Sequence, residues 1–173
     1  EYTNDSKGNP TTTISWTYDE DKMVRVLDEK VHNTYDSHGN STEEIGQRYD
    51  TTSVAWVNEE KYTYTYDVND NMTGAANNYW DTQTSAWVNN NQTSYTHDAN
   101  NNETERITML WDFQASAFEN NSRETTAWNA NDNATLSESY SWTGSAWDKY
   151  FRTTFTYLSG GEKDTELDEW SAD

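Results

Sequence analysis

The sequence repeats a short polar motif at a fixed interval of 31 residues. The last asparagine of this motif falls at Asn9, Asn40, Asn71, Asn102 and Asn133, and a threonine follows two residues after each. A period of this length is typical of arrays in which each unit buries its surface against its neighbours. We therefore predict one repeat array over residues 1–173, with units at about 10–40, 41–71, 72–102, 103–133 and 134–162 and partial units at both ends.

Each unit combines strand and turn signals. Tyrosine and threonine alternate over residues 61–66, so Tyr62, Tyr64 and Tyr66 would line one face of a β-strand. Residues 67–71 follow, and their Asp and Asn side chains favour a tight turn. The polar residues 58–60 interrupt the returning strand and predict a β-bulge or a second small turn.

Two antiparallel strands per unit define the expected fold class. We predict an all-β protein without helices, in which an antiparallel β-hairpin meander stacks into an elongated β-solenoid-like array. Aromatic residues keep step with the repeat and would form ladders along it, each cross-strand pair contributing about 0.2 to 1 kcal/mol. After Trp142 the phase slips by two residues, which predicts a shortened hairpin at residues 143–145. The predicted ladder residues are Tyr18, Tyr49, Trp80, Trp111, Trp142, Tyr35, Tyr66, Trp128, Tyr157, Trp56, Trp87, Phe118 and Trp147.

The composition by itself points toward disorder, but the aromatic residues argue against it. Leu, Ile, Val and Phe together number only 19 of 173 residues, and the net charge is −20. The 9 Trp and 12 Tyr supply large apolar surfaces at regular positions. We therefore expect an ordered, aromatic-rich sheet.

Charge and hydropathy exclude several kinds of partner. Eleven basic residues against 31 acidic ones argue against nucleic acid and anionic membrane surfaces. The sequence contains neither an apolar run long enough to span a bilayer nor a basic-then-apolar leader, so we expect a soluble, mature chain with no membrane insertion. Cysteine is absent, which excludes disulfides and thiolate metal sites.

Three of the turns carry a resemblance to a known family. The segments 35–40, 66–71 and 97–102 begin with Tyr-Asp or His-Asp and end in Asn, and they resemble the tyrosine-aspartate repeats of Rhs-type proteins. The elements around Trp56 and Trp87 look more like repeat arrays of secreted bacterial cell-surface proteins. This resemblance implies strands alternating with turns and an extracellular or cell-surface location.

The turn acids offer a candidate metal site. Oxygen-bearing side chains occupy alternate residues at Asp67, Asn69 and Asn71, and again at Asp98, Asn100 and Asn102, as they do in calcium loops. The bidentate Glu of an EF-hand is missing. Plain β-turns and weak calcium sites are therefore the two interpretations, and no other cofactor is predicted.

Four glycosylation sequons occupy one equivalent turn position, at Asn40, Asn71, Asn102 and Asn133. A sugar attached there would point outward. An alternative interpretation is that the Thr of each sequon only begins the next strand. Covalent sugars and bound glycans are thus both candidate partners.

These features favour a structural role over catalysis. His32, His38 and His97 lie in different registers of the repeat, and no nucleophile or phosphate-loop motif is present, so we expect no enzyme activity. The chain opens on a returning strand and closes on an outgoing one, which predicts head-to-tail self-association. We predict an extracellular stalk, fibre or matrix filament, with a cell-surface adhesin or carbohydrate-binding module as the alternative.

Overall fold

The computed structural model describes residues 1–20, 23–158 and 160–170, and every regular element among them is a β-strand. None of these residues forms a helix that could cross a membrane. The strands are β1 (Tyr2–Asn4), β2 (Pro10–Asp19), β3 (Val24–Tyr35), β4 (Ser41–Asp50), β5 (Ala55–Tyr66), β6 (Met72–Asp81), β7 (Ala86–His97), β8 (Glu103–Asp112), β9 (Ala117–Trp128), β10 (Ala134–Trp142), β11 (Trp147–Tyr157) and β12 (Lys163–Trp170).

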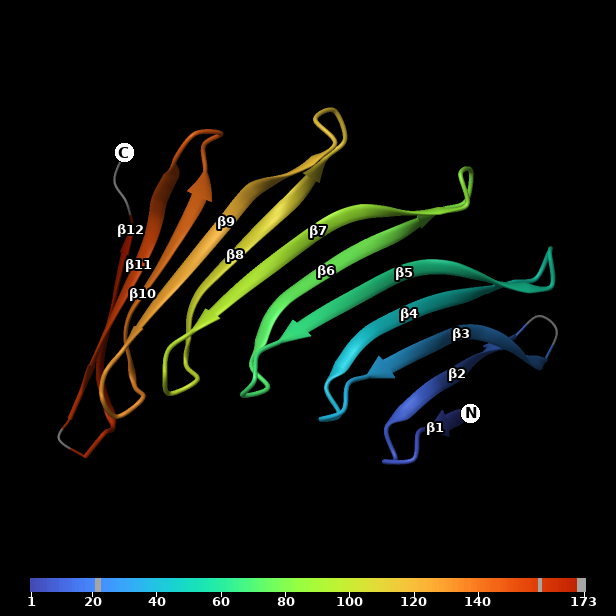
Figure 1. Ribbon diagram of the computed structural model, residues 1–173, viewed down its shortest axis with the longest axis horizontal. Coiled ribbons are helices and arrows are strands. Elements are labelled where there is room, and N and C mark those ends of the chain that lie inside the picture. Colours follow the sequence, from blue (N-terminus) through green and yellow to red (C-terminus); the bar gives the residue numbers. More distant parts are fainter. Residues whose placement is uncertain (21–22, 159, 171–173) are drawn as a thin grey trace. The chain divides into compact units, whose positions relative to one another are not determined.

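The strands form one open sheet in chain order, each hydrogen-bonded to the next (Figure 1). Hairpin loops connect consecutive strands, so the topology is an antiparallel meander. This confirms the predicted fold class at the level of an all-β antiparallel meander. By residue contacts the chain divides into two compact units, residues 1–66 with 75–90, and residues 67–74 with the described residues from 91 onward.

Five-residue turns connect the strand pairs β1/β2, β3/β4, β5/β6, β7/β8 and β9/β10 at residues 5–9, 36–40, 67–71, 98–102 and 129–133. In each turn the first amide donates to the fifth carbonyl, and the fourth amide donates to the first carbonyl. The fourth residue has a left-handed backbone, for example Gly39 at φ 102° and Asp70 at φ 66°. This is a type I turn closed by a bulge, the geometry that Gly, Asn and Asp adopt at least cost.

The loops at the other end of the hairpins also contain a left-handed residue. Val54, Ser85 and Ser116 have φ values of 55°, 53° and 53° at equivalent places before β5, β7 and β9. Asp50 and Asp81 open two of these loops, and each accepts a backbone amide and a side-chain hydroxyl of its own loop. The connection before β11, residues 143–146, has four residues like the others, but only these four separate the paired Trp142 and Trp147, whereas six separate Trp111 and Phe118. The hairpin is therefore two residues shorter between its paired rings, as the phase slip predicted.

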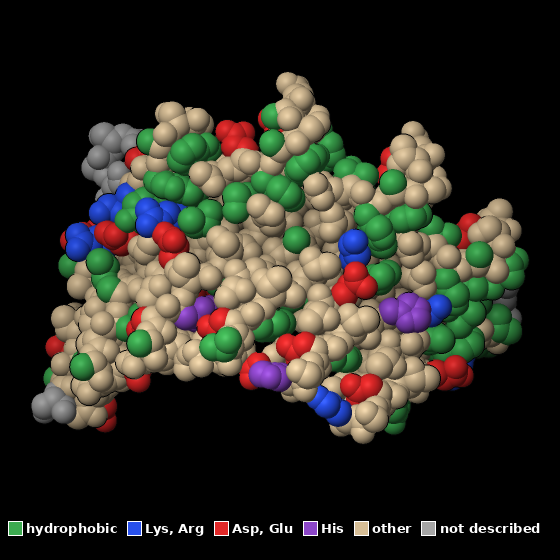
Figure 2. All heavy atoms as spheres, in the orientation of Figure 1, with side chains coloured by type: hydrophobic (Ala, Val, Ile, Leu, Met, Phe, Trp, Pro, Cys, Tyr) green, Lys and Arg blue, Asp and Glu red, His purple; other side chains and the backbone are tan. Residues whose placement is uncertain are grey.

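The sheet has no apolar interior within the described part of the chain. No described hydrophobic side chain is fully buried, and the two most buried side chains are polar: Asn77 at 8% and Thr153 at 6% exposure. Figure 2 shows uncharged polar side chains and backbone over much of the face in view, with hydrophobic side chains in separate patches. Stability therefore comes from half-buried contacts between neighbouring strands, with no enclosed core to supply it.

Candidate functional site

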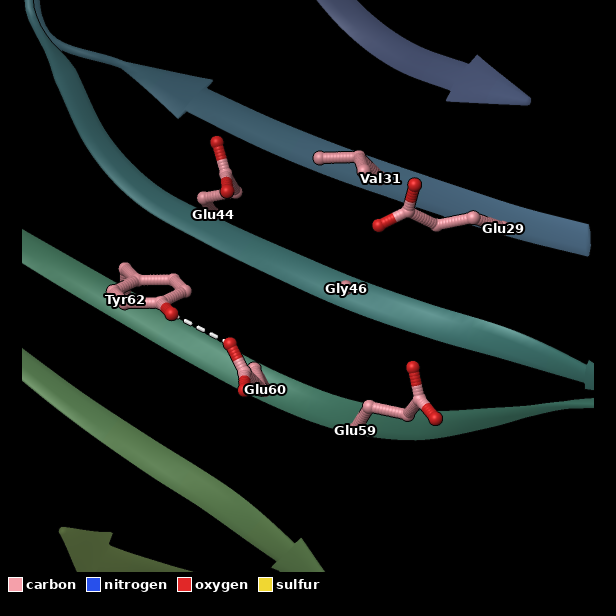
Figure 3. A pocket seen from close by; sticks show the side chains of 7 residues that line it. All are labelled: Glu29, Val31, Glu44, Gly46, Glu59, Glu60 and Tyr62. Carbon is pink, nitrogen blue, oxygen red and sulfur yellow. Dashed lines mark hydrogen bonds between the residues drawn. The ribbon is translucent and has the colours of Figure 1, made fainter. Parts of the chain in front are cut away.

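A hollow lined by several carboxylates lies on one face of β3, β4 and β5 (Figure 3). It encloses about 290 Å³, and Gly46 lies in its middle between the surrounding side chains. We call it the acidic hollow. Its lining residues are Glu29 and Val31 from β3, Glu44 and Gly46 from β4, and Glu59, Glu60 and Tyr62 from β5.

Strand register and one bulge bring these side chains together. Gly46 lies opposite both Val31 and Glu60, and Glu44 lies opposite Tyr62. The register of β4 with β5 shifts after Gly46, where Glu60 and then Asn58 are paired and the residue between them is left over. Because β5 is continuous there, the predicted interruption at residues 58–60 is a bulge and not a second turn. The bulge allows two consecutive glutamates to line one hollow, which a regular strand would place on opposite faces.

Two carboxylates of the acidic hollow have a partner within the chain. Tyr62 Oη donates a 2.5 Å hydrogen bond to Glu60 Oε2, and this bond raises the pKa of Tyr62 to about 12 because ionising the phenol would place two negative charges together. Arg48 Nε lies 2.7 Å from Glu59 Oε1, in an exposed ion pair. Among the described residues, no basic side chain forms an ion pair with Glu29 or Glu44.

The chemistry available in the acidic hollow is hydrogen-bond acceptance. Its carboxylates can receive the N–H groups of a cation, and the Tyr62 ring and Val31 supply a small apolar wall. No set of three His, Asp or Glu among the described residues has an arrangement that would hold a metal ion. Sequence analysis did not single out this site, although Gly46, isolated in a strand, and the Glu pairs at 43–44 and 59–60 were visible signals.

Eight of the predicted ladder residues form four ring pairs, each within one hairpin. The rings meet edge to face, with centroid distances of 5.2 Å for Tyr49–Trp56, 5.0 Å for Trp80–Trp87, 5.0 Å for Trp111–Phe118 and 5.1 Å for Trp142–Trp147. Edge-to-face contact is the geometry that the ring quadrupoles favour. In the first hairpin Arg25 lies opposite Tyr18 and stacks on Trp16 at 5.7 Å, leaving the Tyr18 ring 52% exposed.

Contacts between successive hairpins on this face use cations in addition to rings. Lys30 Nζ lies 5.5 Å from the Trp56 ring centre, and Lys61 Nζ lies 5.3 Å from that of Trp87. Each lysine comes from the hairpin before the ring that it contacts. The faces of these two rings are therefore occupied by an ammonium group of the same chain.

Three of the ladder residues near the five-residue turns donate hydrogen bonds from their hydroxyl or indole N–H groups to backbone carbonyls. Tyr35 Oη donates to Pro10 O at 2.9 Å, and Tyr157 Oη donates to Ala134 O at 2.7 Å. Trp128 Nε1 donates to Glu103 O at 2.9 Å. Tyr66 occupies the same register without a described hydrogen bond from its hydroxyl. Tyr35, Trp128 and Tyr157 thus satisfy carbonyl groups at the start of the preceding strand.

The predicted calcium ligands hold their own turns together. Asp67 Oδ1 accepts the amides of Asn69 and Asn71 at 2.8 and 3.0 Å, and Oδ2 accepts Asn71 Nδ2 at 3.1 Å. Asp98 makes the equivalent bonds with Asn100 and Asn102. The hydrogen bonds from the Asn71 side chain and from the turn amides lower the pKa of Asp67. These carboxylates therefore have a structural partner in the turn, and calcium binding stays a prediction.

The sequon asparagines take part in the same turns. Asn40 Nδ2 donates to Asp36 Oδ2 at 3.2 Å. Asn71 Nδ2 donates both to its own turn and to Asn101 Oδ1 at 2.8 Å, and Asn102 Nδ2 donates to its own turn and to Asp132 Oδ1 at 2.9 Å. Asn133 contributes its backbone amide, which donates to Asn129 Oδ1 at 3.2 Å. A sugar on Asn71 or Asn102 would remove one of these N–H groups, and glycosylation stays a prediction.

The described residues thus form an open antiparallel β-meander with an acidic hollow on one face. The chain matches no known family model, and no curated protein sequence matches it significantly. A solved structure of a protein of unknown function from Bacteroides fragilis is similar, with a TM-score of 0.59 and 14% identity over 73% of this chain and 91% of that chain. At this identity the similarity shows a shared fold and nothing about function.

Two DUF3836 family proteins are also similar over part of the chain. The protein from Bacteroides vulgatus has a TM-score of 0.44 and 19% identity, covering 54% of this chain and 90% of its own. The protein from Parabacteroides distasonis has a TM-score of 0.41 and 16% identity, covering 62% of this chain and 88% of its own.

Proposed function

We propose that this chain is a non-catalytic, extracellular structural repeat protein that forms a stalk, fibre or matrix filament. In this proposal its 31-residue units are structural repeats that stack into a solenoid-like array, similar to the tyrosine-aspartate arrays of Rhs-type proteins. The observation that carries the proposal is the absence of any fully buried hydrophobic side chain among the described residues. Such a sheet gains stability by adding neighbours, because no closed core limits its length.

Side-chain contacts between successive turns support this proposal. Asn71 bonds to Asn101, and Asn102 bonds to Asp132, in each case linking a five-residue turn to the next one along the chain. The Lys7 ammonium likewise reaches the carbonyl of Ser37 in the following turn. Contacts of this kind can be repeated indefinitely along a sheet.

Head-to-tail assembly is the mechanism that we propose for filament growth. The strand at one edge of the sheet would pair its main-chain groups with the edge strand of another molecule. A contact between two different surfaces that does not close into a ring produces a filament. β12 is a suitable edge because its side chains from Lys163 to Glu169 are exposed.

Electron microscopy of the purified protein over a concentration series tests filament formation. Leu167→Lys adds a charge on β12, where Leu167 is 56% exposed, and we expect it to reduce filament number and length. Leu158→Lys is the matched control, because Leu158 lies outside the strands and is 52% exposed. Monodisperse particles at every concentration, or equal filaments from both variants, would contradict head-to-tail assembly.

Exposed aromatic rings support a second candidate function, that of a cell-surface adhesin or carbohydrate-binding module. Tyr18 on β2 is 52% exposed, so its ring can stack on a sugar. We expect glycan-array binding to disappear in Tyr18→Ala. Trp87→Ala is the control for the loss of a ladder ring, because the Trp87 ring already contacts Trp80 and Lys61.

A further inference from the structure

Gly46 leaves an opening in the face of the sheet, although its backbone conformation does not require a glycine. Its φ lies outside the left-handed region, so another residue could adopt the same conformation. Glycine inside a strand weakens it, and it often marks a place where another molecule approaches closely. A Cβ built at Gly46 would come no nearer than 3.9 Å to any neighbour, that neighbour being Glu60 O. Local packing therefore does not explain the glycine.

The same register position carries a side chain in later hairpins. Asn77, 31 residues after Gly46, is only 8% exposed and accepts a hydrogen bond from Asn90 at 2.6 Å. Thr108, a further 31 residues on, lies 3.3 Å from Thr93 through the two hydroxyl oxygens. The acidic hollow is thus a feature of β3–β5 and not a general consequence of the repeat.

The charges around the acidic hollow are not balanced within the described chain. Every described basic side chain is already engaged: Arg48, Arg106, Arg123, Arg152, Lys149 and Lys163 with carboxylates, Arg25, Lys30 and Lys61 with aromatic rings, and Lys7 with a carbonyl. Lys30, adjacent to Val31, stacks on Trp56 and is thereby directed away from Glu29 and Glu44. Glu29 and Glu60 are exposed and Glu44 is partly exposed, so their carboxylates are accessible to a cation of another molecule.

We propose that this face of β3–β5 binds an extended basic segment of a partner protein, with one lysine or arginine side chain entering the acidic hollow above Gly46. The cationic head meets Glu29, Glu44 and Glu60, and the methylene stem lies against Val31 and the Tyr62 ring. The mixed apolar and acidic lining fits an amphipathic side chain better than a bare metal ion. The uncovered sheet face leaves room for the backbone of the segment.

Isothermal titration calorimetry with the full chain tests this proposal. The probe is a synthetic heptapeptide of alternating lysine and threonine with blocked ends, and an alternating glutamate and threonine peptide is its counterpart. We expect the basic peptide to bind and the acidic peptide not to bind. Affinity should fall by about tenfold or more between 50 and 200 mM salt, because the attraction is electrostatic and partly exposed.

Three variants localise the binding. Gly46→Asn fills the acidic hollow with the side chain that the next hairpin accommodates, and we expect about tenfold weaker binding without a change in charge. Glu44→Gln should weaken peptide binding about fivefold. Glu43 is the adjacent residue of β4 and faces the opposite side of the sheet, so the peptide affinity of Glu43→Gln should stay within about twofold of that of the parent. Gly46→Ala adds one carbon with space to spare and should have a small effect, which covers the case that Gly46→Asn does not fold.

Several outcomes would overturn the proposal. Failure of the basic peptide to bind the parent chain would do so. Parent-like binding by both Gly46→Asn and Glu44→Gln would indicate attraction to net charge alone. Spermine binding as tightly as the peptide, with the same dependence on Gly46 and Glu44, would assign the hollow to a small amine. Because none of these measurements depends on filaments, their failure is distinguishable from failure of the proposed function.

Discussion

The phenolic oxygen of Tyr62 donates a 2.5 Å hydrogen bond to the carboxylate of Glu60, two residues earlier on β5. This bond makes the protonated phenol part of the folded state and raises its pKa to about 12. The folded protein therefore holds this proton more tightly than the unfolded chain, whose tyrosines titrate near 10. The stabilisation is fully present below pH 10 and is lost as the pH rises toward 12.

A difference titration isolates this tyrosine. We expect the 295 nm absorbance of the parent minus that of Tyr62→Phe to report one tyrosine ionising near pH 12. In a Glu60→Gln background the same difference should shift toward pH 10, because the charged acceptor is gone. A difference curve centred near pH 10 in the parent would show that the hydrogen bond does not persist in solution.

The Trp80–Trp87 ring pair should contribute measurably to stability. We expect Trp87→Ala to lower the free energy of unfolding by about 2 kcal/mol, because it removes the edge-to-face contact and the Lys61 contact together. Trp87→Phe should cost less, since Phe118 makes the equivalent pair with Trp111. Chemical denaturation measures both variants. Equal losses from the two would contradict a role for the ring.

The hydroxyl hydrogen bonds of the tyrosines should contribute to stability separately from the packing of their rings. Tyr157→Phe keeps the ring and removes the 2.7 Å bond to Ala134 O, so we expect a loss of about 1 kcal/mol and a Tm lower by about 2 to 4 °C. Tyr66→Phe is the matched control, because no hydrogen bond from its hydroxyl is observed among the described residues, and its Tm should not change. A larger fall in Tm for Tyr66→Phe than for Tyr157→Phe would contradict the stabilising role of the Tyr157 hydrogen bond.

The left-handed backbone of Val54 is an opportunity for stabilisation. A β-branched residue at φ 55° is strained, and Asn adopts this conformation more readily. We expect Val54→Asn to stabilise the protein by about 1 kcal/mol. Ser85→Asn, at φ 53° in the equivalent loop, should gain less, because serine has no branched carbon chain. A thermal melt of the two variants decides whether the strain is real.

The turn carboxylates should make the fold sensitive to acid. The side chain and amide of Asn71 hold the pKa of Asp67 below its usual value, so its contribution to stability is present above about pH 3.8 and is lost as the pH falls through the folded-state pKa. We expect Asp67→Asn to lower Tm at pH 7 and to have little effect at pH 2. Asn129, which already occupies this position in the β9/β10 turn, accepts two backbone amides and shows that the substitution is tolerated.

The same Asp67→Asn protein tests calcium binding. If the turn is only structural, adding millimolar calcium should leave Tm unchanged in both the parent and the variant. A calcium-dependent rise in Tm in the parent that disappears in the variant would assign the metal to residues 67–71.

Much of the fold was predictable because its signals are local. Alternating Tyr and Thr at 62–66 and the Asp-to-Asn turn at 67–71 depend on backbone geometry within a few residues, and the strands and turns lie where these patterns predicted them. The shortened hairpin between Trp142 and Trp147 followed in the same way from the phase of these two residues.

The roles of individual side chains were less predictable, because they depend on neighbours across the sheet. A shared register made Trp56 and Trp87 members of a ladder, but whether such a ring meets another ring, a lysine or solvent depends on the strand beside it. The turn asparagines similarly showed a sequon, but not that the side-chain amides of Asn71 and Asn102 each donate both within their own turn and to the next turn.

The sequence by itself determined that this chain forms antiparallel hairpins at regular steps, since strand alternation and turn chemistry act over short distances. Only the tertiary structure decided that Glu29, Glu44 and Glu60, drawn from three different strands, surround Gly46. Cross-strand register and the bulge at Glu59 set that arrangement. Both depend on pairing between strands, which no single stretch of sequence encodes.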